Sequence, residues 1–191
     1  MTLFDGWYRG WCAYAQHHGI EASACSLATV DARAHPHVRM VLLKGYGEQG
    51  FCFYTDLMSA KSQHLYHNPH AALCFYWHGH HRQVRVVGRC SPIADKDAQA
   101  YFASRESLSQ LGAWASSQSR PLVSRRQLEE RVKARTHQFQ TTIPKPQQWG
   151  GFCLKPTDIE FWQQEKGRLH QRKLYTQKPK QKTWQCVMLS P

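Results

Sequence analysis

The stretch HVRMVLLKGYGEQGFCFYT, residues 37–55, contains two apolar segments separated by the turn-forming residues GEQG. Two short apolar runs with such a connection predict a β-hairpin. A third run, ACSLATV at 24–30, precedes the hairpin, and two more, AALCFYWH at 71–78 and RQVRVVGRC at 82–90, follow it. Adjacent short strands with tight turns favour an antiparallel sheet, and we expect this sheet to close into a barrel.

Helical patterns lie on both sides of these strands. One helix is predicted over about residues 2–18, a short one over 59–67, and further helices within an insertion at about 95–139. Strand patterns return in GGFCLK, IEFW, RLHQRKLY and TWQCVML, and KPKQK at 178–182 is predicted to be a hairpin loop. We therefore expect one domain over residues 1–191, mainly β with α, in which peripheral helices surround an antiparallel β-barrel.

The composition is that of a folded protein of the cytoplasm. Hydrophobic residues make up 41% of the chain, which excludes global disorder, and no apolar run is long enough to span a bilayer. The first ten residues, MTLFDGWYRG, carry an acid where a signal peptide has basic residues, so we expect a cytoplasmic location and no membrane partner. The seven cysteines include no C-x-x-C pair, and we expect them to be mostly buried and reduced.

Positive charge is concentrated in the second part of the chain. The net charge is +12, and residues 120–191 hold 15 basic against 5 acidic residues. Such an excess predicts an anionic partner, for which nucleic acid, a membrane surface and phosphorylated small molecules are the classes to consider. The sequence contains no aromatic-plus-basic recognition motif, and its cations are not gathered on one helix, so we expect no nucleic-acid partner.

Common catalytic and metal-binding motifs are missing from the sequence. It contains no G-x-S-x-G, no phosphate-binding Walker loop, no dinucleotide-binding glycine pattern and no H-E-x-x-H. Histidines cluster in HPH at 35–37 and HGHH at 78–81, but neither cluster has cysteine or carboxylate ligands at the spacing of a metal site. We therefore expect surface histidines and no bound metal.

Tyr101, Arg105 and Ser109 follow one another at steps of four residues. If one helix runs through all three, they share one stripe of its surface. Two hydroxyls and a guanidinium in a row can hold a phosphate monoester. The alternative interpretation is the ordinary polar face of an amphipathic helix.

The pentapeptide RLHQR at 168–172 follows the apolar run IEFW. On a β-strand its side chains alternate between faces, which puts Arg168, His170 and Arg172 on the same side. Like charges so close together repel each other unless water screens them or an anion lies between them. The pentapeptide therefore predicts an anionic ligand near this strand.

A set of short motifs occurs in a characteristic order along the chain. These are RMVLLK, FYT, SAK, RQVRVVG, YFASR, SQLGAW, QS, WGGF, IEFWQ, RLHQR and the closing LSP. With these motifs in register from Thr2 to Pro191, the sequence resembles the pyridoxamine 5′-phosphate oxidase (pyridoxine 5′-phosphate oxidase) family of FMN flavoproteins. The resemblance implies the split-barrel fold of that family.

The resemblance also implies a function and a homodimer. The family oxidises the C4′ amine or alcohol of pyridoxamine or pyridoxine 5′-phosphate to pyridoxal 5′-phosphate by hydride transfer to FMN, and dioxygen becomes hydrogen peroxide. FMN lies at the subunit interface, so that each site uses residues of both chains. The cofactor carries the difficult chemistry, and the protein orients and desolvates the reactants.

Carried over residue by residue, the resemblance implies three sets of site residues. Arg168 and His170 are the expected catalytic residues, because they face the substrate ring. The expected substrate-binding residues are Lys44, Tyr101, Arg105, Ser109, Arg168 and His170. The expected FMN-binding residues are Arg39, Met40, Val41, Leu42, Leu43, Lys44, Tyr54, Thr55, Lys61, Gln83, Gln118, Ser119, Trp162 and Arg172.

Several features depart from the family pattern. The family motif S-R-K reads Ser59-Ala60-Lys61 here, and losing that arginine is expected to weaken the FMN phosphate site by about 1.5–3 kcal/mol. The family motif R-L-H-D-R has Gln171 in place of the acid. Family members also carry a segment ahead of the first helix that helps to cover the substrate, and we expect that cover to be absent. Strict alternation would further put Arg39 and Lys44 on opposite faces of their strand, unless a bulge intervenes or the strand serves two pockets.

Two alternative functions therefore remain open beside the oxidase of vitamin B6 phosphates. One is an FMN-dependent oxidase of the same fold with another substrate, as in the phenazine pathway, which the expected lack of a cover favours. The phosphate-binding residues at 44, 101, 105 and 109 argue against it. The other is a non-catalytic module that binds a flavin or another anion without turnover.

Overall fold

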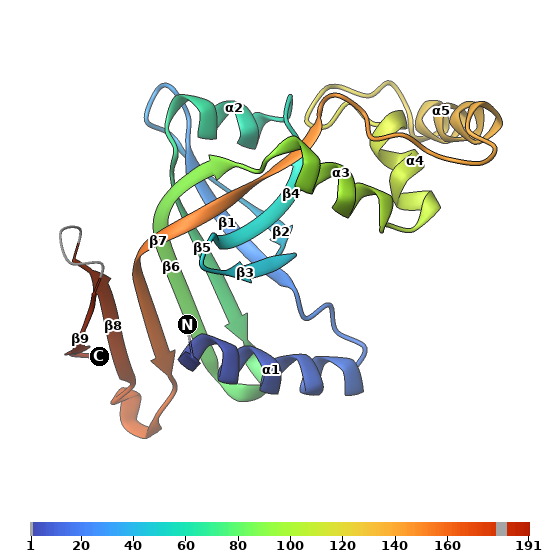
Figure 1. Ribbon diagram of the computed structural model, residues 1–191. Helices are drawn as coiled ribbons and strands as arrows, with labels where there is room; N and C mark the ends of the chain where they lie inside the picture. Colours follow the sequence, from blue (N-terminus) through green and yellow to red (C-terminus); the bar gives the residue numbers. More distant parts are fainter. Residues whose placement is uncertain (1, 179–182) are drawn as a thin grey trace.

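The computed structural model describes residues 2–178 and 183–191 (Figure 1). The expected KPKQK loop therefore lies almost wholly outside the described residues. The helices are α1 Thr2–His17, α2 Ala60–His67, α3 Asp95–Ala103, α4 Ser107–Ala115 and α5 Arg125–Gln138, with single 3₁₀ turns η1 His78–His80 and η2 Lys166–Arg168. The strands are β1 Ala24–Val30, β2 Pro36–Leu42, β3 Gly45–Gly47, β4 Gly50–Asp56, β5 His70–Trp77, β6 Arg82–Pro92, β7 Trp149–Gln163, β8 Gln171–Gln177 and β9 Trp184–Leu189.

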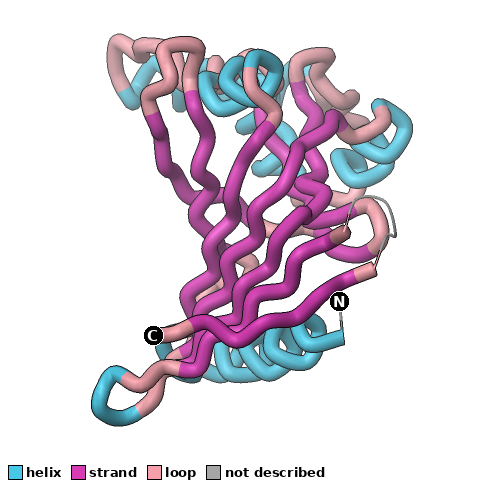
Figure 2. The backbone as a smooth tube through the Cα atoms, turned by 90° about the vertical axis from the view of Figure 1, so that its left-hand side faces the viewer, coloured by secondary structure: helices cyan, strands magenta, loops and turns pink. Residues whose placement is uncertain are grey.

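These strands form an antiparallel sheet in the order β2-β1-β5-β6-β7-β4-β3, and β8 and β9 extend it from β7. The two ends of this order, β2 and β3, are consecutive in sequence. Between them the chain changes partner, because the Leu43 amide donates to Ser23 O of the loop before β1 and the Lys44 amide donates to Cys52 O of β4. This crossing bends the sheet into a barrel (Figure 2). The predicted fold class, an antiparallel barrel with peripheral helices, is confirmed.

One end of the barrel is closed by α1 (Figure 1). Phe4 of α1 is fully buried, and its ring makes edge-to-face contacts with Phe51 at 4.8 Å and Phe75 at 5.4 Å between ring centroids. Trp11, about two helical turns further along α1, stacks on Trp77 at the end of β5. Burial of each large apolar side chain contributes about 1.5–3 kcal/mol, so this aromatic cluster fixes α1 on the barrel.

The opposite end of the molecule carries α2 to α5, with α3 to α5 inside the predicted helical insertion (Figure 1). Ala98 and Phe102 of α3 pack against Trp149, the first residue of β7, in a second buried cluster. This contact ties the insertion to the barrel and positions the segment between α3 and α4. No helix in the described part of the chain combines the length and apolar character needed to cross a membrane.

The expectation that the cysteines are reduced is wrong for one pair. Cys52 of β4 and Cys153 of β7 lie directly opposite each other in the ladder and form a disulfide with a Cα–Cα distance of 4.0 Å. Sequence spacing gave no signal for this pair, because 101 residues separate the two cysteines and only strand pairing brings them together. Cys25 and Cys90 are buried free thiols, as expected, whereas Cys186 is exposed.

Candidate active site

Two adjoining cavities of about 300 and 220 Å³ lie where β2, β4, the start of β7 and the α3–α4 region meet. Tyr54, Thr55, Arg105, Gln118 and Trp149 line both cavities. The remaining predicted residues that line one or the other are Met40, Val41, Leu42, Lys44, Lys61, Tyr101 and Ser109. The structure thus brings together most of the predicted site residues between 40 and 118.

Aromatic rings form one wall of the cavities. Tyr54 stacks between Tyr101, at 4.1 Å, and Trp149, at 5.1 Å with the rings within 3° of parallel. Tyr54 pairs with Gly151 in the β4–β7 ladder, and a Cβ at Gly151 would lie 2.3 Å from Phe53 O and 3.0 Å from the Tyr54 ring. Glycine is therefore required here for the close approach of the two strands. Trp149 was not among the predicted site residues, and its only signal in the sequence was its place in the motif WGGF.

Lys61 is the buried cation of the site. It lies in the first turn of α2 and is only 8% exposed. Its Nζ donates to Gln118 Oε1 at 2.7 Å, to Thr55 Oγ1 at 2.9 Å and to Ser59 Oγ at 3.2 Å. These neutral acceptors orient the ammonium group but do not balance its charge.

In the described part of the chain, the cations around the cavities have no acidic partner at ion-pair distance, although Asp56 lines the larger cavity and acts weakly to raise the pKa of Lys61. Among the residues that the structure describes, none of the ion pairs involves Arg39, Lys44, Lys61 or Arg105. Burial and the nearby Arg39 guanidinium lower the pKa of Lys61 from 10.5 to about 8, and burial lowers the pKa of Arg39. The lowered pKa values show that the charged forms of these side chains are unfavourable in this site. Because a bound negative charge would stabilise the charged forms, the site fits an anionic ligand.

Arg105 provides a second indication of an anion. It lies in the segment between α3 and α4, and its guanidinium packs over Trp149 at 5.0 Å and Phe102 at 5.7 Å from the ring centroids. Its Nη1 is buried and has no hydrogen-bond partner among the residues that the structure describes. Such unpartnered buried donors are rare in native structures, and a phosphate oxygen would satisfy this one.

Tyr101, Arg105 and Ser109 do not lie on one helix, so the condition for a common stripe is not met. Helix α3 ends at Ala103 and α4 begins at Ser107, so Tyr101 and Ser109 lie on different helices with Arg105 between them. Nevertheless, Arg105 lines a cavity with Ser109 and another with Tyr101. The bend between the helices, rather than a common stripe, brings the three side chains to the cavities.

The structure places Arg39 and Lys44 differently relative to the cavities. Lys44 lines the smaller cavity, and the break between β2 and β3 removes the strict alternation that would have placed it opposite Arg39. Arg39 does not line the cavities; its Nη1 donates to Leu27 O and to Thr29 Oγ1 of β1. Leu43 is buried in the core, and Ser119 follows Gln118 in a left-handed conformation with φ 67°.

A second group of predicted residues lies elsewhere. Gln83 of β6, Trp162 of β7 and Arg172 of β8 are direct neighbours in the ladders and form a row across three strands. Arg172 is held by Glu160, with Nε 2.8 Å from Oε1. This hydrogen bond raises the pKa of Arg172, so the guanidinium has a fixed place and a permanent charge.

Arg168 and His170 border this row but do not share a strand with Arg172 as predicted, because β8 begins only at Gln171. Gly167 and Arg168 have φ of 65° and 63°, and this left-handed turn ends the alternation assumed for RLHQR. The His170 ring lies 4.7 Å from that of Trp162. Positive φ at a non-glycine residue costs energy and is often found at functional sites, and both Ser119 and Arg168 show it.

The two groups are far apart within one chain. The two cavities are not lined by any residue of the second group, which consists of Gln83, Trp162, Arg168, His170 and Arg172. Trp149 and Trp162 lie near opposite ends of β7, thirteen residues apart, which corresponds to roughly 40 Å of strand. One chain therefore does not assemble all of the predicted residues around a single ligand.

The barrel and the cations beside an aromatic wall define a class of protein: a split-barrel protein with a site that fits an anionic, flat ligand. Comparisons with known proteins identify the family. Residues 17–139 match the profile of the pyridoxamine 5′-phosphate oxidase family, and residues 149–191 match the pyridoxine 5′-phosphate oxidase C-terminal dimerisation region. The chain belongs to the pyridoxine/pyridoxamine 5′-phosphate oxidase family, a family of flavin-binding oxidoreductases, and the dimerisation region supports a homodimer.

Individual relatives agree with this assignment. A pyridoxine/pyridoxamine 5′-phosphate oxidase of Paraburkholderia phytofirmans is 47% identical over 171 residues, covering 90% of this chain and 80% of the relative. Among solved structures, PhzG from Burkholderia lata in complex with tetrahydrophenazine-1-carboxylic acid has a TM-score of 0.87 at 26% identity, covering 96% of this chain and 90% of PhzG. A pyridoxamine 5′-phosphate oxidase-related, FMN binding protein from Nostoc punctiforme has a TM-score of 0.75 at 20% identity, covering 96% of this chain and 97% of that protein, and shows the same fold.

Proposed function

We propose that the protein is an FMN-dependent oxidase that converts pyridoxamine or pyridoxine 5′-phosphate to pyridoxal 5′-phosphate, while dioxygen is reduced to hydrogen peroxide. The observation that carries the proposal is the set of cations around the two cavities, which form no ion pair within residues 2–178 and 183–191 and include a buried nitrogen of Arg105 without a hydrogen-bond partner there. Two phosphorylated ligands, a flavin and a B6 vitamer, would supply the missing negative charge.

The residues divide between the two ligands. Lys61, Arg39, Thr55 and Gln118 would hold the FMN phosphate, since Lys61 already contacts Thr55 and Gln118 and lies near Arg39. Ala60, which stands where the family has an arginine, is exposed at the start of α2 and adds no charge. FMN binding should therefore depend strongly on Lys61.

The substrate phosphate would lie between Lys44, Tyr101, Arg105 and Ser109. Arg105 is fixed against Trp149 and directs an unpaired donor into buried space, so it would bind a phosphate oxygen with little reorganisation. Tyr101 is held by its stacking on Tyr54. A preorganised cradle of this kind costs little entropy on binding.

The second group would complete the site from the other subunit. Because Trp162 and Trp149 are about 40 Å of strand apart, Gln83, Trp162 and Arg172 of one chain would meet the cavities of its partner. In that arrangement Arg168 and His170 would face the substrate ring and keep its C4′ carbon in place. Each subunit would then contribute half of each active site.

When bound, FMN would accept the hydride from substrate C4′ and pass the electrons on to dioxygen. The protein's own task is to orient the reactants and to exclude water, which can lower the barrier by about 7–11 kcal/mol. Arg168 and Arg172 would neutralise negative charge on the ligands, and Glu160 keeps the Arg172 guanidinium in position.

A second candidate, oxidation of a phenazine precursor, is favoured by one observation: the similarity to PhzG, with a TM-score of 0.87. The phosphate cradle at Lys44, Tyr101, Arg105 and Ser109 argues against it, because a substrate without phosphate would leave these groups unpaired. A third candidate, a flavin-binding module without catalysis, would retain the flavin but give no turnover.

The decisive experiment combines a spectrum with a peroxide assay. The purified protein should be yellow, should release FMN rather than FAD, and should produce peroxide with pyridoxamine or pyridoxine 5′-phosphate. Unphosphorylated pyridoxamine is the matched control and should react far more slowly. Turnover of tetrahydrophenazine-1-carboxylic acid alone would favour the second candidate, and a yellow protein without turnover of any of these compounds would favour the third.

A further inference from the structure

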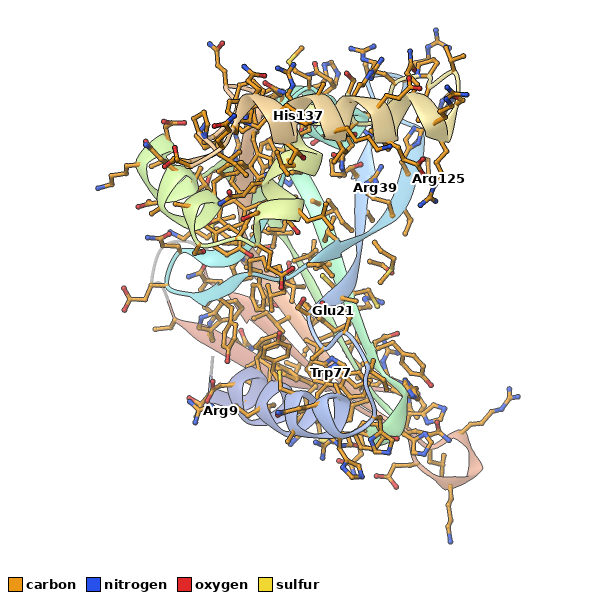
Figure 3. The ribbon with its side chains drawn as sticks, turned by 90° about the vertical axis from the view of Figure 1, so that its right-hand side faces the viewer. Arg9, Glu21, Arg39, Trp77, Arg125 and His137 are labelled. Carbon is orange, nitrogen blue, oxygen red and sulfur yellow. A yellow bond between two sulfur atoms is a disulfide. The ribbon has the colours of Figure 1, made fainter. Side chains whose placement is uncertain are left out.

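Arg39 is held in place by the neighbouring strand β1. Its Nη1 donates to Leu27 O at 3.1 Å and to Thr29 Oγ1 at 2.6 Å, and Leu27 is its direct partner in the β1–β2 ladder. Figure 3 shows Arg39 at the end of the molecule away from Trp77 and α1. Both acceptors use the same nitrogen, and the other guanidinium nitrogens make no hydrogen bond with the described residues, so they can donate to a ligand.

The direction of the hydrogen bonds follows from the chemistry of the groups. Arginine can only donate, so the Thr29 oxygen accepts from Arg39. Thr29 is 1% exposed, and its own hydroxyl hydrogen therefore needs an acceptor within the protein. His64 Nδ1 lies 3.0 Å from Thr29 Oγ1 and meets this need if the imidazole is neutral with its hydrogen on Nε2.

Other titratable or charged groups surround His64. The His37 ring of β2 lies 4.5 Å from it, and Asp31 holds His37 through a contact of 3.1 Å between Oδ2 and Nε2. Burial, His37 and Arg39 lower the pKa of His64, while Asp31 acts weakly in the opposite direction. The neutral form required by the hydrogen-bond directions is therefore also the form that these surroundings favour.

We propose that Thr29 and His64 are positioning residues for Arg39, and that through it they set how strongly the site prefers a phosphorylated flavin to an unphosphorylated one. The hydrogen-bond chain runs from α2 through β1 to β2, so it connects three elements around one guanidinium. The identity of the ligand rests on the proposed function. The connection among the three residues rests on geometry alone.

The test is the ratio of the riboflavin and FMN dissociation constants, measured by flavin fluorescence titration at pH 8 on flavin-free protein. Thr29→Val and His64→Leu each break the chain and should lower this ratio ~10-fold, the size of one charge-assisted hydrogen bond, while riboflavin affinity stays constant. Thr29→Ser and His64→Gln keep a hydroxyl and an acceptor and should restore the ratio. His67→Leu is the matched control, because His67 is exposed on the same helix, and it should leave the ratio unchanged.

Two results would overturn the inference. An unchanged ratio in Thr29→Val and His64→Leu would show that Arg39 does not depend on them. An equal loss of both flavins would show that the two residues maintain the fold and not the phosphate preference. A wild-type protein that binds FMN no better than riboflavin would instead contradict the proposed function itself, so the two failures can be told apart.

Discussion

Lys61 should lower the stability of the flavin-free protein. It is a buried cation next to another cation, Arg39, and it has only neutral hydrogen-bond acceptors. We therefore expect Lys61→Met, which preserves the length of the side chain and removes the charge, to raise the free energy of unfolding at pH 7. A binding site whose buried cation stabilises the protein only when an anion is bound would show this gain in stability when the cation is removed.

The magnitude follows from the lowered pKa. The shift from 10.5 to about 8, at 1.36 kcal/mol per pKa unit, corresponds to about 3 kcal/mol. Between these two pH values the unfolded chain binds a proton that the folded protein has lost, so stability rises with pH across this window and is lowest below pH 8. Thr55 still donates to Gln118 in the variant, so the hydrogen bonds lost with the ammonium group cost little and the net gain should be about 2 kcal/mol.

The assay is urea unfolding of flavin-free protein at pH 7 and pH 10, at one fixed protein concentration. The advantage of Lys61→Met should be present at pH 7 and mostly gone at pH 10, where wild-type Lys61 is neutral. Lys133→Met, an exposed position on α5, should show no such pH-dependent advantage. Saturating FMN should reverse the order, because the ligand stabilises the form that binds it. The reasoning would be refuted if Lys61→Met were no more stable than wild type at pH 7. It would also be refuted if the gain in free energy of unfolding were the same at pH 7 and pH 10.

Three further predictions concern packing, the disulfide and catalysis. Gly151→Ala should destabilise the protein by about 1–3 kcal/mol, because the added Cβ would meet the opposite strand. Gly6→Ala on α1 is the control and should stabilise the protein by about 0.5–1 kcal/mol, because the described residues leave open space around that Cβ. Thermal unfolding measures both variants, and equal effects would contradict the close approach of the strands at Gly151. Reducing the Cys52–Cys153 disulfide, which closes a loop of about 100 residues, should lower the free energy of unfolding by about 4 kcal/mol, as measured by urea unfolding. The Cys52→Ser variant should no longer respond to reductant. A wild-type protein whose stability does not change with reductant would contradict a stabilising role of the disulfide. Arg168→Ala should lower kcat by about 10²-fold with FMN still bound, as measured by peroxide release and flavin absorbance; loss of flavin instead would assign Arg168 to the cofactor.

The regular elements could be predicted because local patterns specify them. The predicted segment ACSLATV begins and ends at the same residues as β1. Its side chains are alternately buried and partly exposed, because successive residues of a strand point to opposite faces of the sheet. The sequence pattern indicated two helical segments, DKDAQAYFASR and SLSQLGAWASSQS, and the structure places the break between them at residues 104–106, where no glycine or proline lies. This break depends on a tertiary contact, in which Gln110 Nε2 donates to Phe102 O at 2.8 Å and thereby satisfies a carbonyl at the end of α3.

The sequence by itself determined the strands, the helices and the inventory of cations, because periodicity and turn residues act over a few neighbouring positions. Only the tertiary structure decided which cations share a cavity without acidic partners, that Trp149 belongs to its wall, and that Cys52 meets Cys153. It also decided that Trp162 and Arg172 lie far from Lys61. These relations depend on strand pairing and on packing between residues from 57 positions apart (Lys61 and Gln118) to 101 positions apart (Cys52 and Cys153), for which spacing along the chain carries no signal.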